Sequence, residues 1–101
     1  MSKYRMEDGT VVNTDSAARY WGDRTDFDGH NEIHRTTRDQ WSGENLYRSR
    51  KGRYYVEHYS QWQGAHDYAT WVSPEEAAAW LTLNDYSIPA ELAEAADRVT
   101  E

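Results

Sequence analysis

A row of carboxylates near the C-terminus has the spacing most suggestive of a specific role. Its members, in chain order, are Glu75, Glu76, Glu91, Glu94, Asp97 and Glu101. The last four follow one another at intervals of three, three and four residues, which places them on one helix face roughly 5 Å apart along the axis. Phosphates recur about every 3.4 Å along a DNA strand. The row could therefore imitate a nucleic-acid backbone, although a solvated helix face is the commoner reason for this pattern.

A group of cations surrounds a predicted turn in the middle of the chain. Arg48, Arg50, Lys51 and Arg53 lie beside Tyr54 and its neighbours. Cations next to aromatic rings suit single-stranded nucleic acid, because the cations contact phosphates and the rings stack on bases. The net charge of −7 opposes a polyanion, so a solvated turn, internal ion pairs or an acidic partner protein explain the same residues more readily.

Acidic and imidazole side chains also meet in the segment 26–34. Asp26, Asp28, His30 and His34 offer oxygen and nitrogen ligands, but the segment lacks the regular ligand series and distal Glu of an EF-hand. Gly29 favours a loop, in which two histidines four residues apart do not share a helix face. The sequence therefore predicts a turn capped by the aspartates, without a metal or cofactor.

Catalytic motifs are the weakest signal in the chain. Glu57 and His58 are adjacent on a predicted strand, so their side chains point to opposite faces and form no dyad. His34 or His66 paired with a distant carboxylate remains an alternative, since the 18 acidic residues make such pairs easy to form by chance. We expect no enzyme.

The elements that must position these side chains centre on residues 44–64. This stretch reads as two long antiparallel strands joined at 49–52, with Gly52 supplying the left-handed residue of the turn. The sequence also predicts strands at 3–6, 10–12, 32–37 and 68–72, loops at 22–31 and 37–43, and a helix at 15–21. The hairpin should form the centre of the sheet.

Two further helices follow the strands. Ser73-Pro74-Glu75-Glu76 combines a capping box with a proline at the first helical position, which predicts a helix to about Leu83 with Asn84 as a left-handed stop. Pro89 opens a last helix to about Val99. Strands followed by helices indicate an α+β domain, an antiparallel sheet of four to five strands with helices on one face.

Composition supports one domain over residues 1–101 with an aromatic core. Aliphatic side chains are few, but eight Tyr and five Trp can each bury roughly 150–250 Å². The absence of cysteine fits a reducing compartment, and no apolar run is long enough for a signal peptide or a membrane span. We expect a cytoplasmic protein.

Some of these rings should reach solvent. Helices cover only one face of the predicted sheet, so the other face should expose aromatic side chains such as Tyr55, Tyr59 and Trp62. Tyr and Trp are favoured contact residues in protein interfaces. The same rings could instead stabilise the sheet through cross-strand pairs.

Several motifs resemble those of a group of short, uncharacterised bacterial proteins. They are D-G-T-V-V-N-T at 8–14, L-Y-R-S-R-K-G-R-Y-Y at 46–55, S-Q-W-Q-G at 60–64, S-P-E-E-A-A-A-W-L at 73–81 and I-P-A-E-L-A-E at 88–94. This resemblance implies no activity and no site residues. In size and acidity the chain also resembles small phage- or plasmid-borne inhibitors of host defence, such as anti-CRISPR and anti-restriction proteins, which implies a protein partner.

Charge is divided unevenly, with +4 over residues 35–53 and −8 over residues 54–101. We therefore expect a non-enzymatic domain that binds a protein partner through the acidic row and exposed aromatic rings, most concretely an inhibitor of a nucleic-acid-handling complex by phosphate mimicry. The alternatives are a single-stranded nucleic-acid-binding module that uses the basic turn, and a small metal-dependent protein or enzyme.

Overall fold

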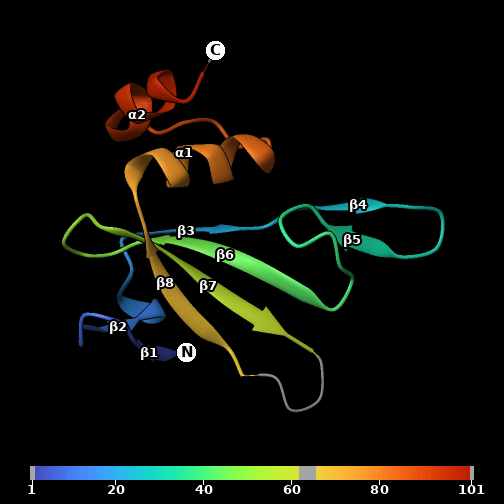
Figure 1. Ribbon diagram of the computed structural model, residues 1–101, viewed down its shortest axis with the longest axis horizontal. Coiled ribbons are helices and arrows are strands. Elements are labelled where there is room, and N and C mark those ends of the chain that lie inside the picture. Colours follow the sequence, from blue (N-terminus) through green and yellow to red (C-terminus); the bar gives the residue numbers. More distant parts are fainter. Residues whose placement is uncertain (1, 62–65, 101) are drawn as a thin grey trace.

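A four-stranded antiparallel sheet crosses the middle of the computed structural model, which describes residues 2–61 and 66–100 (Figure 1). Its strands, in spatial order, are β3 (Arg19–Gly22), β6 (Ser42–Arg48), β7 (Tyr54–Ser60) and β8 (Tyr68–Val72). Two separate hairpins accompany it, β1 (Lys3–Arg5) with β2 (Val11–Asn13) and β4 (Thr25–Phe27) with β5 (Glu32–His34). The predicted α+β class with an antiparallel sheet is confirmed.

The β6–β7 hairpin is the centre of this sheet, as predicted. Leu46 lies directly opposite Val56, and Tyr47 opposite Tyr55, so each pair packs on the same face. The turn that joins the strands has Gly52 at φ +89°, a conformation that a residue without a Cβ adopts readily. The hairpin therefore fixes which side chains face each layer of the molecule.

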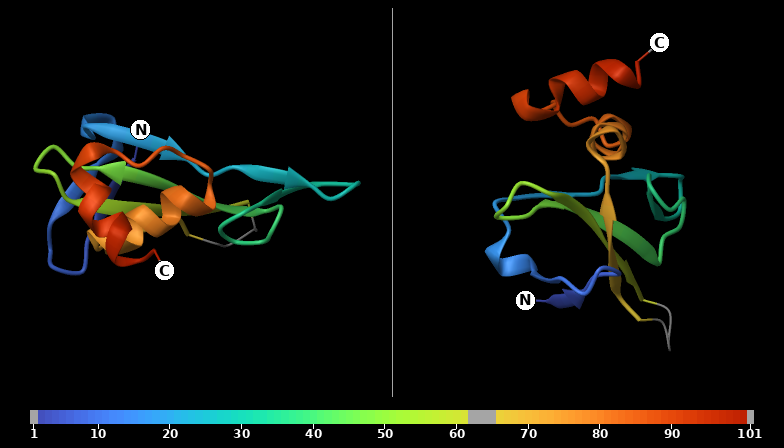
Figure 2. Two further views of the ribbon diagram at one scale, coloured as in Figure 1. Left: turned by 90° about the horizontal axis from the view of Figure 1, so that it is seen from above. Right: turned by 60° about the vertical axis from the view of Figure 1, so that its left-hand side comes forward.

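Helices cover one face of the sheet. They are α1 (Pro74–Leu83), η2 (Ala90–Leu92) and α2 (Ala93–Arg98), stacked above the strands in Figure 2. Leu46 and Leu81 are fully buried between the sheet and α1. The predicted capping box of α1 is confirmed, since the Ser73 hydroxyl accepts from the Glu76 N–H at 3.1 Å and the Glu76 carboxylate accepts from the Ser73 N–H at 2.9 Å.

The β1–β2 hairpin covers part of the opposite face. Met6 and Val12 pack there on Tyr47, Tyr55 and Ala69. The prediction that this face is open was therefore wrong for its central rings. Tyr55 is only 1% exposed and is not available to a partner in the way the sequence suggested.

Four local predictions also differ from the structure. The helix expected at 15–21 is a short 3-10 turn, η1 (Thr14–Ser16), followed by β3, because Trp21 enters the core opposite Leu46 while Tyr20 stays exposed, the alternation of a strand. The loop expected at 22–31 contains β4, and the last helix begins as the 3-10 turn η2. The left-handed residue after α1 is Asp85 at φ 59°, while Asn84 has φ −96°.

Candidate functional site

The acidic row is largely occupied by contacts within the protein. Arg98 binds the Glu75 carboxylate at 2.6 Å and approaches Glu94 at 3.8 Å. Glu91 lies in η2 and accepts a hydrogen bond from the Tyr54 hydroxyl at 3.1 Å. Arg98 also holds the pKa of Glu75 below its usual value. These contacts remove much of the support for phosphate mimicry.

The rest of the row adds little to it. The Glu76 carboxylate closes the capping box of α1, and Asp97 is exposed on α2. Glu101 lies outside the described residues. Three of the five described carboxylates of the row, those of Glu75, Glu76 and Glu91, are therefore engaged within the protein and are not free for phosphate mimicry.

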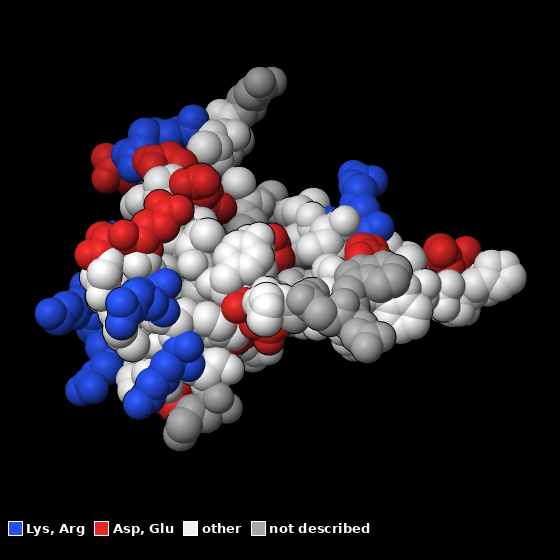
Figure 3. Space-filling model, turned by 60° about the horizontal axis from the view of Figure 1, so that its bottom comes forward, with Lys and Arg blue, Asp and Glu red and all other residues white. Residues whose placement is uncertain are grey.

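Cations gather at the end of the sheet where β6 turns into β7. Figure 3 shows this group of Lys and Arg side chains at the left end of the molecule, next to acidic side chains that run along the helical layer. Arg50 and Lys51 are exposed at the tip of the turn, and among the described residues neither makes an ion pair. Their charges are free to meet a ligand.

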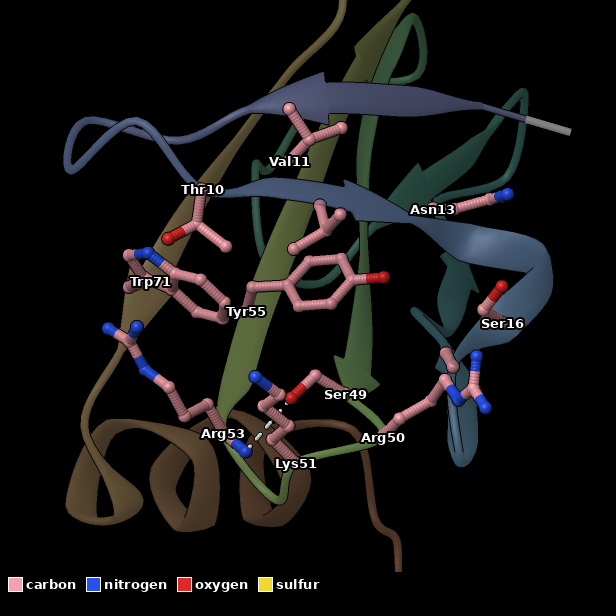
Figure 4. Close-up of a pocket in the computed structure, with 12 residues that line it drawn as sticks. Thr10, Val11, Asn13, Ser16, Ser49, Arg50, Lys51, Arg53, Tyr55 and Trp71 are labelled. Atoms are coloured by element: carbon pink, nitrogen blue, oxygen red, sulfur yellow. Dashed lines mark hydrogen bonds between the residues drawn. The ribbon is translucent and has the colours of Figure 1, made fainter.

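A pocket of about 450 Å³ opens beside these cations. Arg50, Lys51 and Arg53 lie on its turn side, and Tyr55 and Trp71 line its interior (Figure 4). The other lining residues come from the N-terminal segment and from the turn, namely Thr10, Val11, Val12, Asn13, Ser16, Ala17 and Ser49. This basic pocket combines an apolar aromatic interior with a cationic rim.

Local hydrogen bonds fix the rim of the basic pocket. The Gly52 N–H donates to the Ser49 carbonyl at 3.0 Å, and the Ser49 N–H donates to the Arg53 carbonyl at 2.7 Å. The Ser49 hydroxyl also accepts from the Arg53 N–H at 3.1 Å. The turn is thus closed from both sides, which holds the two tip cations beside the pocket.

Arg53 is held by two further contacts. Its guanidinium lies 3.6 Å above the ring of Trp71, a cation–π arrangement. Its Nη1 is 3.2 Å from the Asp8 carboxylate. The backbone N–H of Thr10 holds the pKa of Asp8 well below its usual range, so Asp8 stays ionised and keeps Arg53 in place. A planar cation stacked on an indole suits both phosphate and ring ligands.

Tyr55 has the one tyrosine hydroxyl in the described structure that is buried and lacks a hydrogen-bond partner. The Tyr47 ring stacks on its ring at a centroid distance of 5.1 Å, and the Trp71 ring meets it edge-on at 5.8 Å. Burial, with a smaller effect of the negative charge of Glu57, raises the pKa of Tyr55 to about 12. The hydroxyl therefore remains a neutral hydrogen-bond donor at physiological pH.

Only some of the residues of the predicted basic turn lie together in the structure. Arg50, Lys51 and Arg53 share the basic pocket, whereas Arg48 and Tyr54 face the helical layer. There the Arg48 Nε lies 3.7 Å from Glu91, and the Tyr54 ring is only 5% exposed. Alternation along the strands explains the split, because Arg48 pairs directly with Tyr54 and both project to the helix side.

The remaining aromatic predictions do not form an exposed patch. Tyr59 is half-buried, and its hydroxyl donates to Asp23 at 3.2 Å. Trp62 lies outside the described residues. Trp71 and Val12 also line the basic pocket but were not among the predicted site residues, because β8 and the N-terminal hairpin bring them together from distant parts of the chain.

The acidic segment 26–34 contains the capped turn that the sequence predicts. The Asp28 carboxylate accepts from the backbone N–H groups of His30 and Asn31, each at 2.8 Å. Asp26 differs, since it pairs with Arg35 at 2.9 Å. Within residues 2–61 and 66–100, no three potential ligands come together in a metal-binding group.

A carboxylate–imidazole–hydroxyl series also crosses the helix-facing side of the sheet. His58 Nδ1 is 3.0 Å from the Glu44 carboxylate, and His58 Nε2 is 3.1 Å from the Thr70 hydroxyl. Acyl-transfer triads have the same sequence of carboxylate, imidazole and hydroxyl groups. Here, however, the neighbouring contacts indicate a structural role. The indole N–H of Trp80 donates to Glu44 at 3.1 Å and the Tyr68 ring stacks on His58 at 4.4 Å. We assign the series to the joining of three neighbouring strands.

None of the helices in the described part of the chain is long and apolar enough to cross a membrane. Comparison with family models, with curated proteins and with solved structures finds no match to this chain, so the resemblance noted from its motifs stays a prediction.

Proposed function

We propose that this chain is a binding module for single-stranded nucleic acid, and that the basic pocket is its binding site. The observation that carries the proposal is a pocket with three cations on its rim and an aromatic lining, in which the ring of Trp71 is partly exposed and the ring of Tyr55 is buried behind it. Single strands are bound by this combination, because phosphates meet the cations and unpaired bases meet the rings. An acidic peptide would satisfy the cations but would leave the aromatic interior without a planar partner.

The net charge of −7 limits the strand to a short footprint. Screening confines each charge to about 8–10 Å at physiological salt, so the rim cations act on phosphates close to them while the acidic helical layer repels the strand further away. We expect weak binding, with dissociation constants on the order of 10⁻⁶ to 10⁻⁴ M at low salt. The footprint should cover only a few nucleotides.

The test is a titration of a fluorescent ten-nucleotide thymidine strand, followed by anisotropy between 25 and 200 mM salt. Three phosphate contacts predict a slope of about −2 in the logarithm of the association constant against the logarithm of salt concentration. Replacing Arg50 and Lys51 by Ala should reduce the slope to about −0.7 and abolish binding at the higher salt. Absence of binding at 25 mM salt would remove the proposal.

A matched control separates the pocket from overall charge. Lys3→Ala with Arg5→Ala removes the same two charges from the exposed positions of β1, which do not line the basic pocket. We expect this control to keep the wild-type slope to within about 0.5, because only neutralised phosphates contribute to it. Equal losses in the two double variants would show a general charge effect in place of a site.

Phosphate mimicry of a protein partner is the weaker candidate after these observations. Glu94 is 91% exposed at its side chain, but Glu75 and Glu91 are engaged by Arg98 and Tyr54. A partner would have to replace those contacts before it could use the row. Charge reversal by Glu91→Lys with Glu94→Lys tests the mimicry hypothesis, which predicts that the double variant no longer binds the partner.

A further inference from the structure

The buried hydroxyl of Tyr55 indicates how the basic pocket recognises a nucleic-acid strand. Resting on the proposed function, we propose that the basic pocket takes a single unpaired base, whose polar edge accepts a hydrogen bond from the hydroxyl of Tyr55. The phosphate attached to that nucleotide then lies at the turn, against Arg50, Lys51 and Arg53.

The hydroxyl of Tyr55 is unusual within this protein. Six other tyrosine hydroxyls donate to an oxygen of the protein, and they belong to Tyr4, Tyr20, Tyr47, Tyr54, Tyr59 and Tyr86. Tyr55 is 1% exposed, which is less than the exposure of the other two buried tyrosines, Tyr54 and Tyr47. Its hydroxyl nevertheless has no hydrogen-bond partner among the described residues. A buried polar group without a hydrogen-bond partner destabilises the folded protein. A ligand that supplies an acceptor removes this destabilisation.

The layout of the pocket matches the two ends of a nucleotide. In Figure 4 Arg53 and Lys51 lie on the turn side, while the Tyr55 hydroxyl points away from Arg53, toward the side of the pocket formed by Asn13, Ser16 and the end of the Arg50 side chain. A ligand that reaches both must have an anionic end and, at the far side of a flat apolar body, a polar edge. Nucleotides have this form, since the base carries acceptors on its edge and the phosphate lies at the opposite end.

The size of the pocket limits the number of bases. Pockets that hold small ligands measure about 300–1,000 Å³, and a volume of about 450 Å³ lies in the lower part of that range. This is suited to one ring system with its phosphate and not to a stacked run of bases. Because the hydroxyl is closed off from water, the base must also displace a side chain of the pocket wall in order to reach it.

Tyr55→Phe is the decisive variant, because it removes the hydroxyl and nothing else. Wild-type protein should bind the ten-nucleotide thymidine strand about tenfold more tightly than an abasic strand of equal length, which keeps every phosphate. Tyr55→Phe should lose most of this preference while keeping the salt slope. The variant should be as stable as wild type to urea or more so, since a buried group without a partner is gone.

Two controls complete the experiment. Tyr68→Phe makes the same change at an exposed ring outside the basic pocket and should leave the preference intact. Ala17→Leu fills the pocket from the η1 side and should weaken binding of the thymidine strand more than that of the abasic strand. Ala17→Leu also tests the proposal if Tyr55→Phe does not fold.

The outcomes separate this inference from the proposed function. Equal affinity of wild type for the two strands, or an unchanged preference in Tyr55→Phe, would overturn the single-base pocket while leaving phosphate-driven binding of the strand in place. Failure of both strands to bind would overturn both proposals. If a polyglutamate peptide displaced the fluorescent strand as effectively as unlabelled thymidine strand does, the pocket would recognise carboxylates. That result would also overturn the inference.

Discussion

Replacement of Glu57 by Ala is the sharpest test of what holds the face beneath the N-terminal hairpin. Its carboxylate is buried and accepts from the hydroxyls of Tyr4 at 2.5 Å and Tyr47 at 3.2 Å, and from the side-chain amide of Asn45 at 3.0 Å. Tyr4 belongs to β1, so the carboxylate joins the hairpin to the sheet. Hydrogen bonds to a charged group contribute about 1.5–3 kcal/mol each, but the buried carboxylate itself carries a desolvation cost that its removal recovers.

We therefore expect Glu57→Ala to lower the free energy of unfolding by about 2–4 kcal/mol, because three neutral donors lose a charged acceptor while the desolvation cost of the carboxylate is recovered. Glu57→Gln keeps the shape and one acceptor oxygen and should cost about 1–2 kcal/mol. Urea unfolding at pH 7, followed by tryptophan fluorescence, measures both losses.

Glu7→Ala, an exposed change in the β1–β2 turn, serves as the control and should alter stability by less than about 0.5 kcal/mol. A loss below about 1 kcal/mol for Glu57→Ala would refute the reasoning. It would mean that the three donors find other partners, and that the hairpin is held by apolar packing alone.

Three other predictions concern pH and local structure. Burial raises the pKa of Tyr4 and Tyr55 from 10.0 to about 12, so the folded state binds these protons more tightly. The contribution of these two groups to stability should be constant below pH 10 and should be lost between pH 10 and 12. Urea midpoints across that range measure the loss, and titration of all tyrosines near pH 10 would contradict it. Ser73→Ala removes the helix cap and should cost about 1 kcal/mol, against no change for Ser87→Ala in the same denaturation assay. Gly52→Ala forces a Cβ onto a backbone at φ +89° and should cost about 1–2 kcal/mol, which unchanged stability would disprove.

Local signals in the sequence were sufficient for the elements that depend on few residues. Gly52 and the aromatic arms around it predicted the central hairpin, and Ser73 with Glu76 predicted the start of α1, because a turn and a cap are set by residues next to one another. Residues 15–21 show the opposite case. Their helical spacing was overridden when Trp21 entered the core beside Leu46, a contact between distant segments that no local pattern contains.

The basic pocket depends on tertiary structure in the same way. Its cations were found from sequence because Arg50, Lys51 and Arg53 are neighbours, but its interior requires the β1–β2 hairpin to fold under the sheet. A two-stranded hairpin has little stability of its own, so it must pack on Tyr47 and Tyr55 to persist.

The length of that hairpin explains why a pocket remains. Strands β1 and β2 have three residues each, whereas β6 and β7 have seven, and Figure 4 shows the hairpin strands crossing β7 at a steep angle. They cover a band of the face and leave the portion next to the turn open. Because the ring of Tyr55 spans the boundary, its body is buried by Val12 while its hydroxyl is left without a partner. The packing that stabilises this face therefore also creates the unsatisfied group on which base recognition would depend.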